Sequence, residues 1–198
     1  MRTVQTECST SPPALQVILS PTAEATINIA RTAAVSTDTF EFTVSGVAPG
    51  QYEVTLQNLP AGAYLERVTL SGRRLPQPIL TIADSSIDSI QLNVSPQGVT
   101  VAGVVETDDA RPGVVILMPS TRPWVYRIPF RKRYEEDRTF QFEGVPPGSY
   151  LLYAIPDRDA YDLYDPAIRE CLKKFAVSAT LERGANETVE LQQVPEPR

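Results

Sequence analysis

The sequence of 198 residues contains no histidine, and it has only two cysteines and two methionines. Without histidine the chain cannot form a Ser-His or Cys-His nucleophile pair, and a Cys2His2 zinc site is excluded. The glycine-rich phosphate-binding patterns GxxxxGK[ST] and GxGxxG are also missing. We therefore predict that the protein is not an enzyme and that it has no catalytic residues, no metal site and no cofactor.

The chain also lacks long apolar runs and an excess of positive charge. No stretch approaches the ~20 apolar residues that a membrane helix needs, and residues 1–13 lack the apolar core of a signal peptide. The net charge is −6, and the basic run 131–133 is offset at once by the acidic run 135–137. An acidic surface disfavours nucleic acid as a partner. We expect neither nucleic-acid binding nor membrane insertion.

The two cysteines, Cys8 and Cys171, leave two alternatives open. A disulfide between them would close nearly the whole chain and would imply an oxidising compartment. The alternative is two independent thiols, which the sequence favours because nothing in it places the two residues together.

The most prominent feature of the sequence is a pair of similar segments, one in each half of the chain. Residues 39–54 read TFEFTVSGVAPGQYEV and residues 139–152 read TFQFEGVPPGSYLL. In each, aromatic residues alternate with polar ones, as in a strand with one buried face, and Gly-Val-x-Pro-Gly and a tyrosine follow. We expect each segment to be a β-hairpin or a corner between two sheets. Aligning the Thr-Phe pairs makes Thr43 and Val44 a two-residue extension or bulge in the first segment.

Short alternating strands and turn residues recur along both halves, at about seven strands per half, which is typical of β-sandwiches. The prediction is an all-β protein with two tandem seven-stranded Ig-like or transthyretin-like sandwiches. Its parts are an N-terminal tail at 1–13, a first sandwich at 14–96 (copy one) and a second at 97–198 (copy two). One helix is predicted over 165–174, because Asp165 can cap it and Pro166 suits its first position.

The phrase Phe140, Phe142, Gly144, Val145, Pro146, Pro147, Gly148 and Tyr150 resembles one found in tandem carboxypeptidase regulatory-like domains of bacterial exported proteins. The Leu59, Pro60, Gly62 and Tyr64 segment and the Tyr164, Asp165 and Pro166 segment are similar to other motifs of that family. The resemblance covers roughly residues 14–194. It implies transthyretin-like (prealbumin-like) sandwiches without catalytic activity, and an extracellular or cell-surface location. The family's Asp-x-x-Gly turn before the Phe strand is absent here.

Aromatic and acidic residues provide the candidate binding positions. The candidate surface for carbohydrate or protein consists of Trp124, Tyr126, Tyr161 and Tyr164, although aromatic packing in the core is the competing explanation. Four aspartates in the loop DRDAYDLYD, at 157–165, could attract calcium. That loop lacks the EF-hand spacing, so a solvated loop is the alternative.

Two functional hypotheses remain. The first is a non-catalytic structural or assembly module, such as a stalk, adhesin segment or filament subunit, which self-associates through edge strands or through the N-terminal tail. The second is an accessory binding module for carbohydrate or protein. Deleting residues 1–13 should weaken self-association under the first hypothesis.

Overall fold

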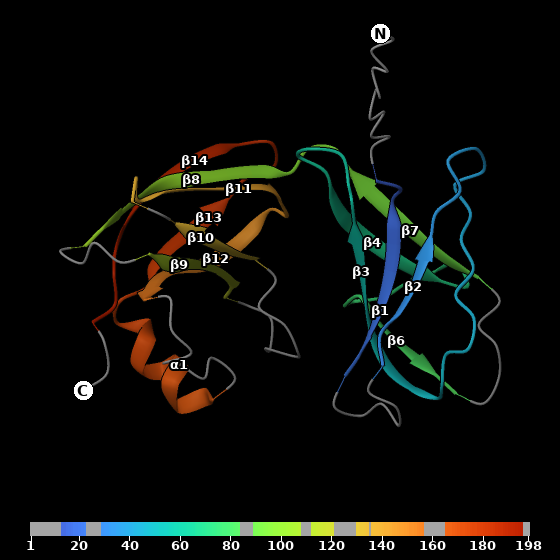
Figure 1. The fold of residues 1–198 in the computed structure, drawn as a ribbon. Helices are drawn as coiled ribbons and strands as arrows, with labels where there is room; N and C mark the ends of the chain where they lie inside the picture. The colour runs from blue at the N-terminus through green and yellow to red at the C-terminus, as the bar shows by residue number, and fades with distance from the viewer. Residues whose placement is uncertain are drawn as a thin grey trace, which may run out of the picture. The chain divides into compact units, whose positions relative to one another are not determined.

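The computed structural model describes residues 13–22, 29–83, 89–107, 112–120, 130–134, 136–156 and 165–195. These residues form 14 strands and one short helix (Figure 1). The prediction of an all-β protein with one helix is confirmed. No helix in the described part of the chain has the length and apolarity needed to cross a bilayer.

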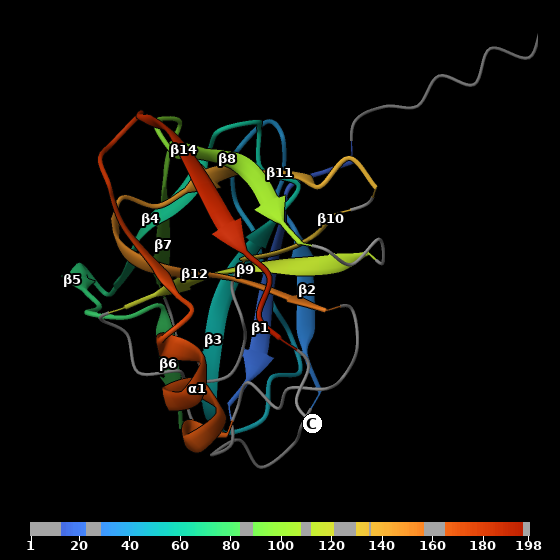
Figure 2. The same ribbon diagram turned by 90° about the vertical axis from the view of Figure 1, so that its left-hand side faces the viewer.

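The strands form four sheets. Those of copy one are β2(Arg31–Ala34)-β1(Gln16–Pro21)-β3(Gly50–Gln57)-β6(Ile79–Ile82) and β5(Arg73–Arg74)-β4(Tyr64–Leu70)-β7(Ile90–Ser95). Those of copy two are β10(Phe130–Tyr134)-β9(Gly113–Pro119)-β12(Gly148–Pro156)-β13(Val177–Leu181) and β11(Thr139–Val145)-β8(Val99–Glu106)-β14(Asn186–Gln192). Neighbouring strands are antiparallel except for β8 and β14, which run parallel (Figure 2).

The chain divides into two compact units by its internal contacts. Unit 1 comprises residues 1–59 and 79–85, and unit 2 comprises residues 60–78 and 86–198. Unit 1 holds the sheet β2-β1-β3-β6, and unit 2 holds the other three sheets and the helix. The division into sandwiches at 14–96 and 97–198 remains a prediction.

In unit 2 the two sheets of copy two enclose an apolar core. Valines of β8 and phenylalanines of β11 meet side chains of β9 and β12, and this cluster includes Val101, Phe140, Leu117 and Leu152. The helix α1(Pro166–Lys173) covers the opposite face of the four-stranded sheet, where Leu172 joins a second buried cluster (Figure 1). Because both faces are covered, all six residues from 113 to 118 are buried.

The helix begins where the sequence predicts. Asp165 has extended backbone angles, and its Oδ1 accepts a hydrogen bond of 2.8 Å from the backbone N–H of Ala167. Pro166 occupies the first helical position, where its missing N–H would have had no helical partner. Leu172 is buried against the sheet and Ile168 packs on the same cluster. These contacts confirm the predicted apolar face of the helix.

The two copies share one backbone plan at a spacing of 98 residues. In copy one Tyr52 pairs with Pro21, and in copy two Tyr150 pairs with Pro119. The hydroxyl of Tyr52 donates to the carbonyl of Ala48, and that of Tyr150 donates to the carbonyl of Pro146, each at 2.9 Å. A tyrosine bonded to the backbone just upstream fixes a corner between sheets. The repeated phrase is therefore a repeated structural corner.

The phrase is a corner and not a hairpin, because β11 and β12 lie in different sheets. The alternation of aromatic and polar residues predicts a strand at Phe40–Val44, which is wrong, because residues 40–45 belong to no strand. Phe40 has a φ of 57°, matching the 56° of Arg138, and its side chain is 76% exposed. The structure thus aligns Phe40 with Arg138, and no extension is needed at 43 and 44.

Candidate interaction sites

The sequence-predicted binding residues lie mostly outside the described residues. Those residues are Trp124, Tyr126, Tyr161, Tyr164 and the tail cysteine Cys8, so the aromatic surface and the disulfide stay predictions. Cys171 lies on α1 and is exposed.

Of the four loop aspartates, the described one is Asp165, which caps the helix. Within the described ranges no group of three or more histidine, cysteine, aspartate or glutamate residues could hold a metal ion.

In unit 1 the segment 41–47 has the alternating sequence of a strand, but it pairs with no strand among the described residues. Phe42 and Val44 are half-buried, whereas Glu41, Thr43 and Ser45 are exposed, so the side chains alternate as in a strand. Within the described residues, the backbone groups of residues 42–44 make no hydrogen bonds. We call residues 41–47 the unpaired segment. The carbonyl of Glu41 accepts from the N–H of Ser36 at 2.9 Å and that of Gly46 accepts from Arg31 Nε at 3.0 Å, so residues 42–44 hold the backbone donors and acceptors that another strand could pair with.

Unit 2 contains a tightly packed joint between the sheet β5-β4-β7 and copy two. The backbone N–H of Gly98 donates to the carbonyl of Gly62 at 2.8 Å. A Cβ on Gly98 would lie 2.6 Å from both the Gly62 oxygen and the Gly144 Cα, and a Cβ on Gly144 would lie 2.4 Å from the oxygen of Ala63. At these distances there is no room for the Cβ of any other residue. The glycines therefore let three backbone segments touch.

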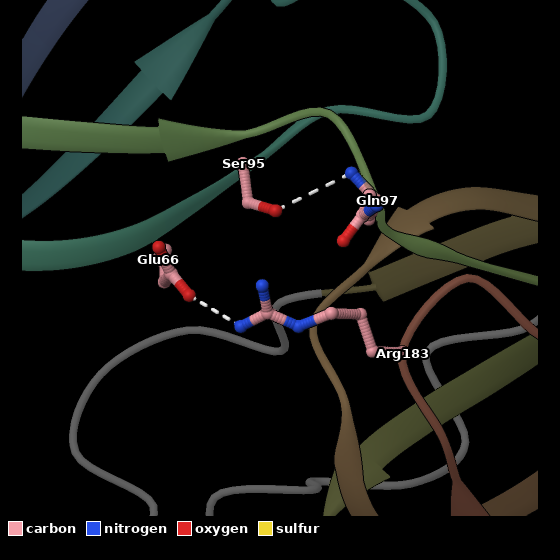
Figure 3. A network of polar contacts seen from close by, with 4 residues as sticks. All are labelled: Glu66, Ser95, Gln97 and Arg183. Carbon is pink, nitrogen blue, oxygen red and sulfur yellow. Dashed lines mark hydrogen bonds and ion pairs between the residues drawn. The ribbon is translucent and has the colours of Figure 1, made fainter.

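Polar contacts surround this joint (Figure 3). Arg183 forms an ion pair with Glu66, and the backbone N–H of Gln97 donates to Ser95 Oγ at 3.3 Å. The N–H of Gly184 donates to the carbonyl of Gln97 at 3.2 Å. Because the Arg183 side chain is half-exposed, its ion pair contributes little free energy by itself. Its contribution is to orient β4 against the turn that precedes β14.

An open groove of about 760 Å³ lies at the far end of copy two, where β8, β12 and β14 finish. The Oγ1 of Thr107 donates to Oε1 of Gln193 on its wall. Glu106 and Arg138 also line it. Their opposite charges give the groove no preference for a charged ligand of either sign.

Three side chains have displaced pKa values. A hydrogen bond from the Thr139 hydroxyl at 2.7 Å, together with one from its backbone N–H, lowers the pKa of Asp137. The hydrogen bond with Glu66 raises the pKa of Arg183. Burial, and then the charge of Glu170, raise the pKa of Tyr153. Asp137 ends the turn before β11, Arg183 forms an ion pair in the joint, and Tyr153 packs under α1. Each pKa shift therefore has a structural cause.

Comparisons with known proteins identify no family. No protein-family model matches the chain, and no curated protein matches it by sequence. The match to carboxypeptidase regulatory-like domains therefore remains a resemblance of motifs.

Two solved structures from bacteria are distantly similar. The Bacillus anthracis TIE protein is 11% identical with a TM-score of 0.31, over 91% of this chain and 30% of that one. GBS52, the minor pilin of the Gram-positive pathogen Streptococcus agalactiae, is 10% identical with a TM-score of 0.28, over 93% and 85%. This chain thus spans less than a third of the TIE protein. With TM-scores this low, neither likeness assigns a function.

Proposed function

We propose that this chain is a non-catalytic structural module of an extracellular or cell-surface protein, used as a stalk, adhesin segment or filament subunit. The observation that carries the proposal is the joint in unit 2. Residues 95–98 connect β7 to β8 without a free linker, and Gly98 touches the backbone at both Gly62 and Gly144. A closely packed connection favours a rigid structural module in which the sheet β5-β4-β7 keeps a fixed orientation to copy two, since domains on loose linkers move.

The location and the self-association belong to the proposal. The location depends on the motif resemblance to exported proteins. The alternative, an accessory module for carbohydrate, depends on aromatic residues outside the described part of the chain. We therefore argue the structural role, in which unpaired strand edges or the N-terminal tail join one chain to another.

A distance measurement across the joint tests the proposal. Spin labels would replace the exposed residues Asn93 in β7 and Thr188 in β14, in a chain whose two cysteines are changed to serine. A narrow distance distribution is expected for the unaltered joint. Gly98→Ala should broaden or shift it, because the new Cβ would meet the backbone at 2.6 Å.

The control substitution is Gly184→Ala. Gly184 has a positive φ of 70°, unlike Gly98, and no atom lies within 4 Å of the position of its Cβ. This variant adds left-handed backbone strain but no close contact, so its distance distribution should match that of the unaltered joint if close contact is what matters. A broad distribution before any substitution would contradict a rigid structural role.

A further inference from the structure

The unpaired segment in unit 1 has the same backbone frame as β11 in copy two. Before the segment, Phe40 and Arg138 have φ values of 57° and 56°. Near its end, Gly46 and Gly144 both have 67°, a conformation that glycine adopts without steric cost. The two segments therefore correspond residue by residue at the 98-residue spacing.

In copy two this segment is a paired strand. Phe140 of β11 lies opposite Gly103 of β8, and Phe142 lies opposite Val101. The backbone N–H of Val105 donates to the carbonyl of Arg138 at 2.8 Å. Both phenylalanines are almost fully buried, with 4% and 6% of their surface exposed. The neighbouring strand β8 thus supplies backbone partners as well as apolar cover.

In unit 1 the corresponding positions have no backbone strand partner within the described residues, and their apolar side chains have only partial cover. Phe42 and Val44 occupy the places of Phe140 and Phe142, yet they are only half-buried. The carbonyl of Phe40, which corresponds to that of Arg138, accepts no hydrogen bond within the described part of the chain. Copy two therefore shows which kind of element would complete the unpaired segment.

That element is a strand with apolar residues at alternate positions. Val99, Val101 and Val105 of β8 are completely buried, Gly103 takes the position between Val101 and Val105 on that face, and Val104 is exposed on the other face. The residues of this chain that correspond to β8 are 1–8, with the sequence MRTVQTEC. They place Thr3 and Glu7 where β8 has Val101 and Val105. Burying those polar groups without partners would be costly.

We propose that the unpaired segment accepts a β-strand from another polypeptide, in antiparallel pairing and with β-branched apolar residues at alternate positions. This deepens the proposed structural role, and it rests on that role because the added strand would link the module to a neighbouring protein. Main-chain hydrogen bonds would supply affinity, and the half-buried stripe of Phe42 and Val44 would select the apolar face of the incoming strand.

The test adds the missing strand as a synthetic peptide. The probe carries residues 98–107, GVTVAGVVET, with solubilising lysines at its ends, and it is mixed with the full chain. Amide hydrogen exchange of residues 42–44 should slow at least tenfold on saturation. A peptide with aspartate in place of the central valine (V101D) should bind at least tenfold more weakly, because a charge would enter an apolar face.

Matched variants of the chain locate the binding. Phe42→Asp places a charge on the covered side and should weaken peptide binding at least tenfold. Thr43→Asp, on the exposed side of the same segment, should leave binding within about twofold, since successive residues face opposite sides. The peptide substitution keeps the test valid even if Phe42→Asp fails to fold, because the chain itself is then unaltered.

Besides the absence of peptide binding, three outcomes would overturn the inference. One is equal binding of the V101D peptide. A second is full protection of residues 42–44 before any peptide is added. The third is binding that occurs only after residues 1–12 are removed, which would make the chain's own tail the occupant. None of these depends on the joint in unit 2. A rigid joint with no peptide binding would refute only the strand acceptor, and a flexible joint with binding would refute only the rigid module.

Discussion

Comparing alanine substitutions at Gly46 and Gly144 would measure how strongly close backbone contact in the joint requires glycine at Gly144. Both have a φ of 67° and occupy the same place in the repeated corner. Replacing either by alanine forces a side chain into the left-handed region, at a cost of about 1 kcal/mol. The surroundings differ: no atom lies within 4 Å of a Cβ on Gly46, whereas a Cβ on Gly144 would lie 2.4 Å from the backbone oxygen of Ala63.

Gly144→Ala should therefore cost more than Gly46→Ala. The oxygen belongs to backbone and cannot rotate away, so the loop at Ala63 must shift, at an added cost of about 1–3 kcal/mol, as in other overpacked sites. Because the two residues lie in different units, one global free energy of unfolding would mix two transitions. Native-state hydrogen exchange solves this, with β3 amides reporting on Gly46→Ala and β12 amides on Gly144→Ala.

The reasoning would be refuted by equal losses of protection, or by a larger loss for Gly46→Ala. Either result would mean that backbone strain, and not the approach of Ala63, determines the requirement for glycine at Gly144. Restoring glycine in each variant is the control for unrelated damage.

Two further predictions concern the corner and the tail. Tyr52→Phe and Tyr150→Phe should each lower local stability by about 1 kcal/mol, because each removes a 2.9 Å hydrogen bond and leaves a carbonyl without its donor; hydrogen exchange of β3 and β12 measures this, and unequal losses would argue against a shared corner. Deleting residues 1–13 should lower the average mass measured by light scattering at high protein concentration, and an unchanged mass would contradict self-association through the tail.

The sequence predicts local structure here where one short segment determines it. Asp165 and Pro166 define the start of α1, because capping depends on residues within one turn. The repeated phrase predicts its corner for the same reason. Aligning Phe40 with Phe140, at a spacing of 100 residues, is wrong. At the spacing of 98 residues Phe42 corresponds to Phe140, so both alignments match one phenylalanine with another and the sequence alone cannot separate them. The φ values of Phe40 and Arg138 resolve that ambiguity.

Features that depend on distant contacts could not be predicted in this way. Gly62, Gly98 and Gly144 read as ordinary turn glycines in the sequence. Their importance comes from the approach of three backbone segments far apart in the chain. The unpaired segment was missed for a related reason: the alternation of Phe42 and Val44 is that of a strand, but a strand also needs a neighbour, and no local pattern reveals whether one is present.

The state of the unpaired segment favours strand acceptance over an ordinary surface loop. An irregular loop has no need for side chains that alternate between a covered and an open side, yet Glu41, Thr43 and Ser45 are exposed while Phe42 and Val44 are half-buried. The positive φ values at Phe40 and Gly46 hold both ends of the segment in the conformation found around β11. Because these side chains already alternate as in a strand, less conformational entropy would be lost when an incoming strand pairs with the segment than with a flexible loop. Substituting Gly46 should therefore weaken strand addition as well as the corner.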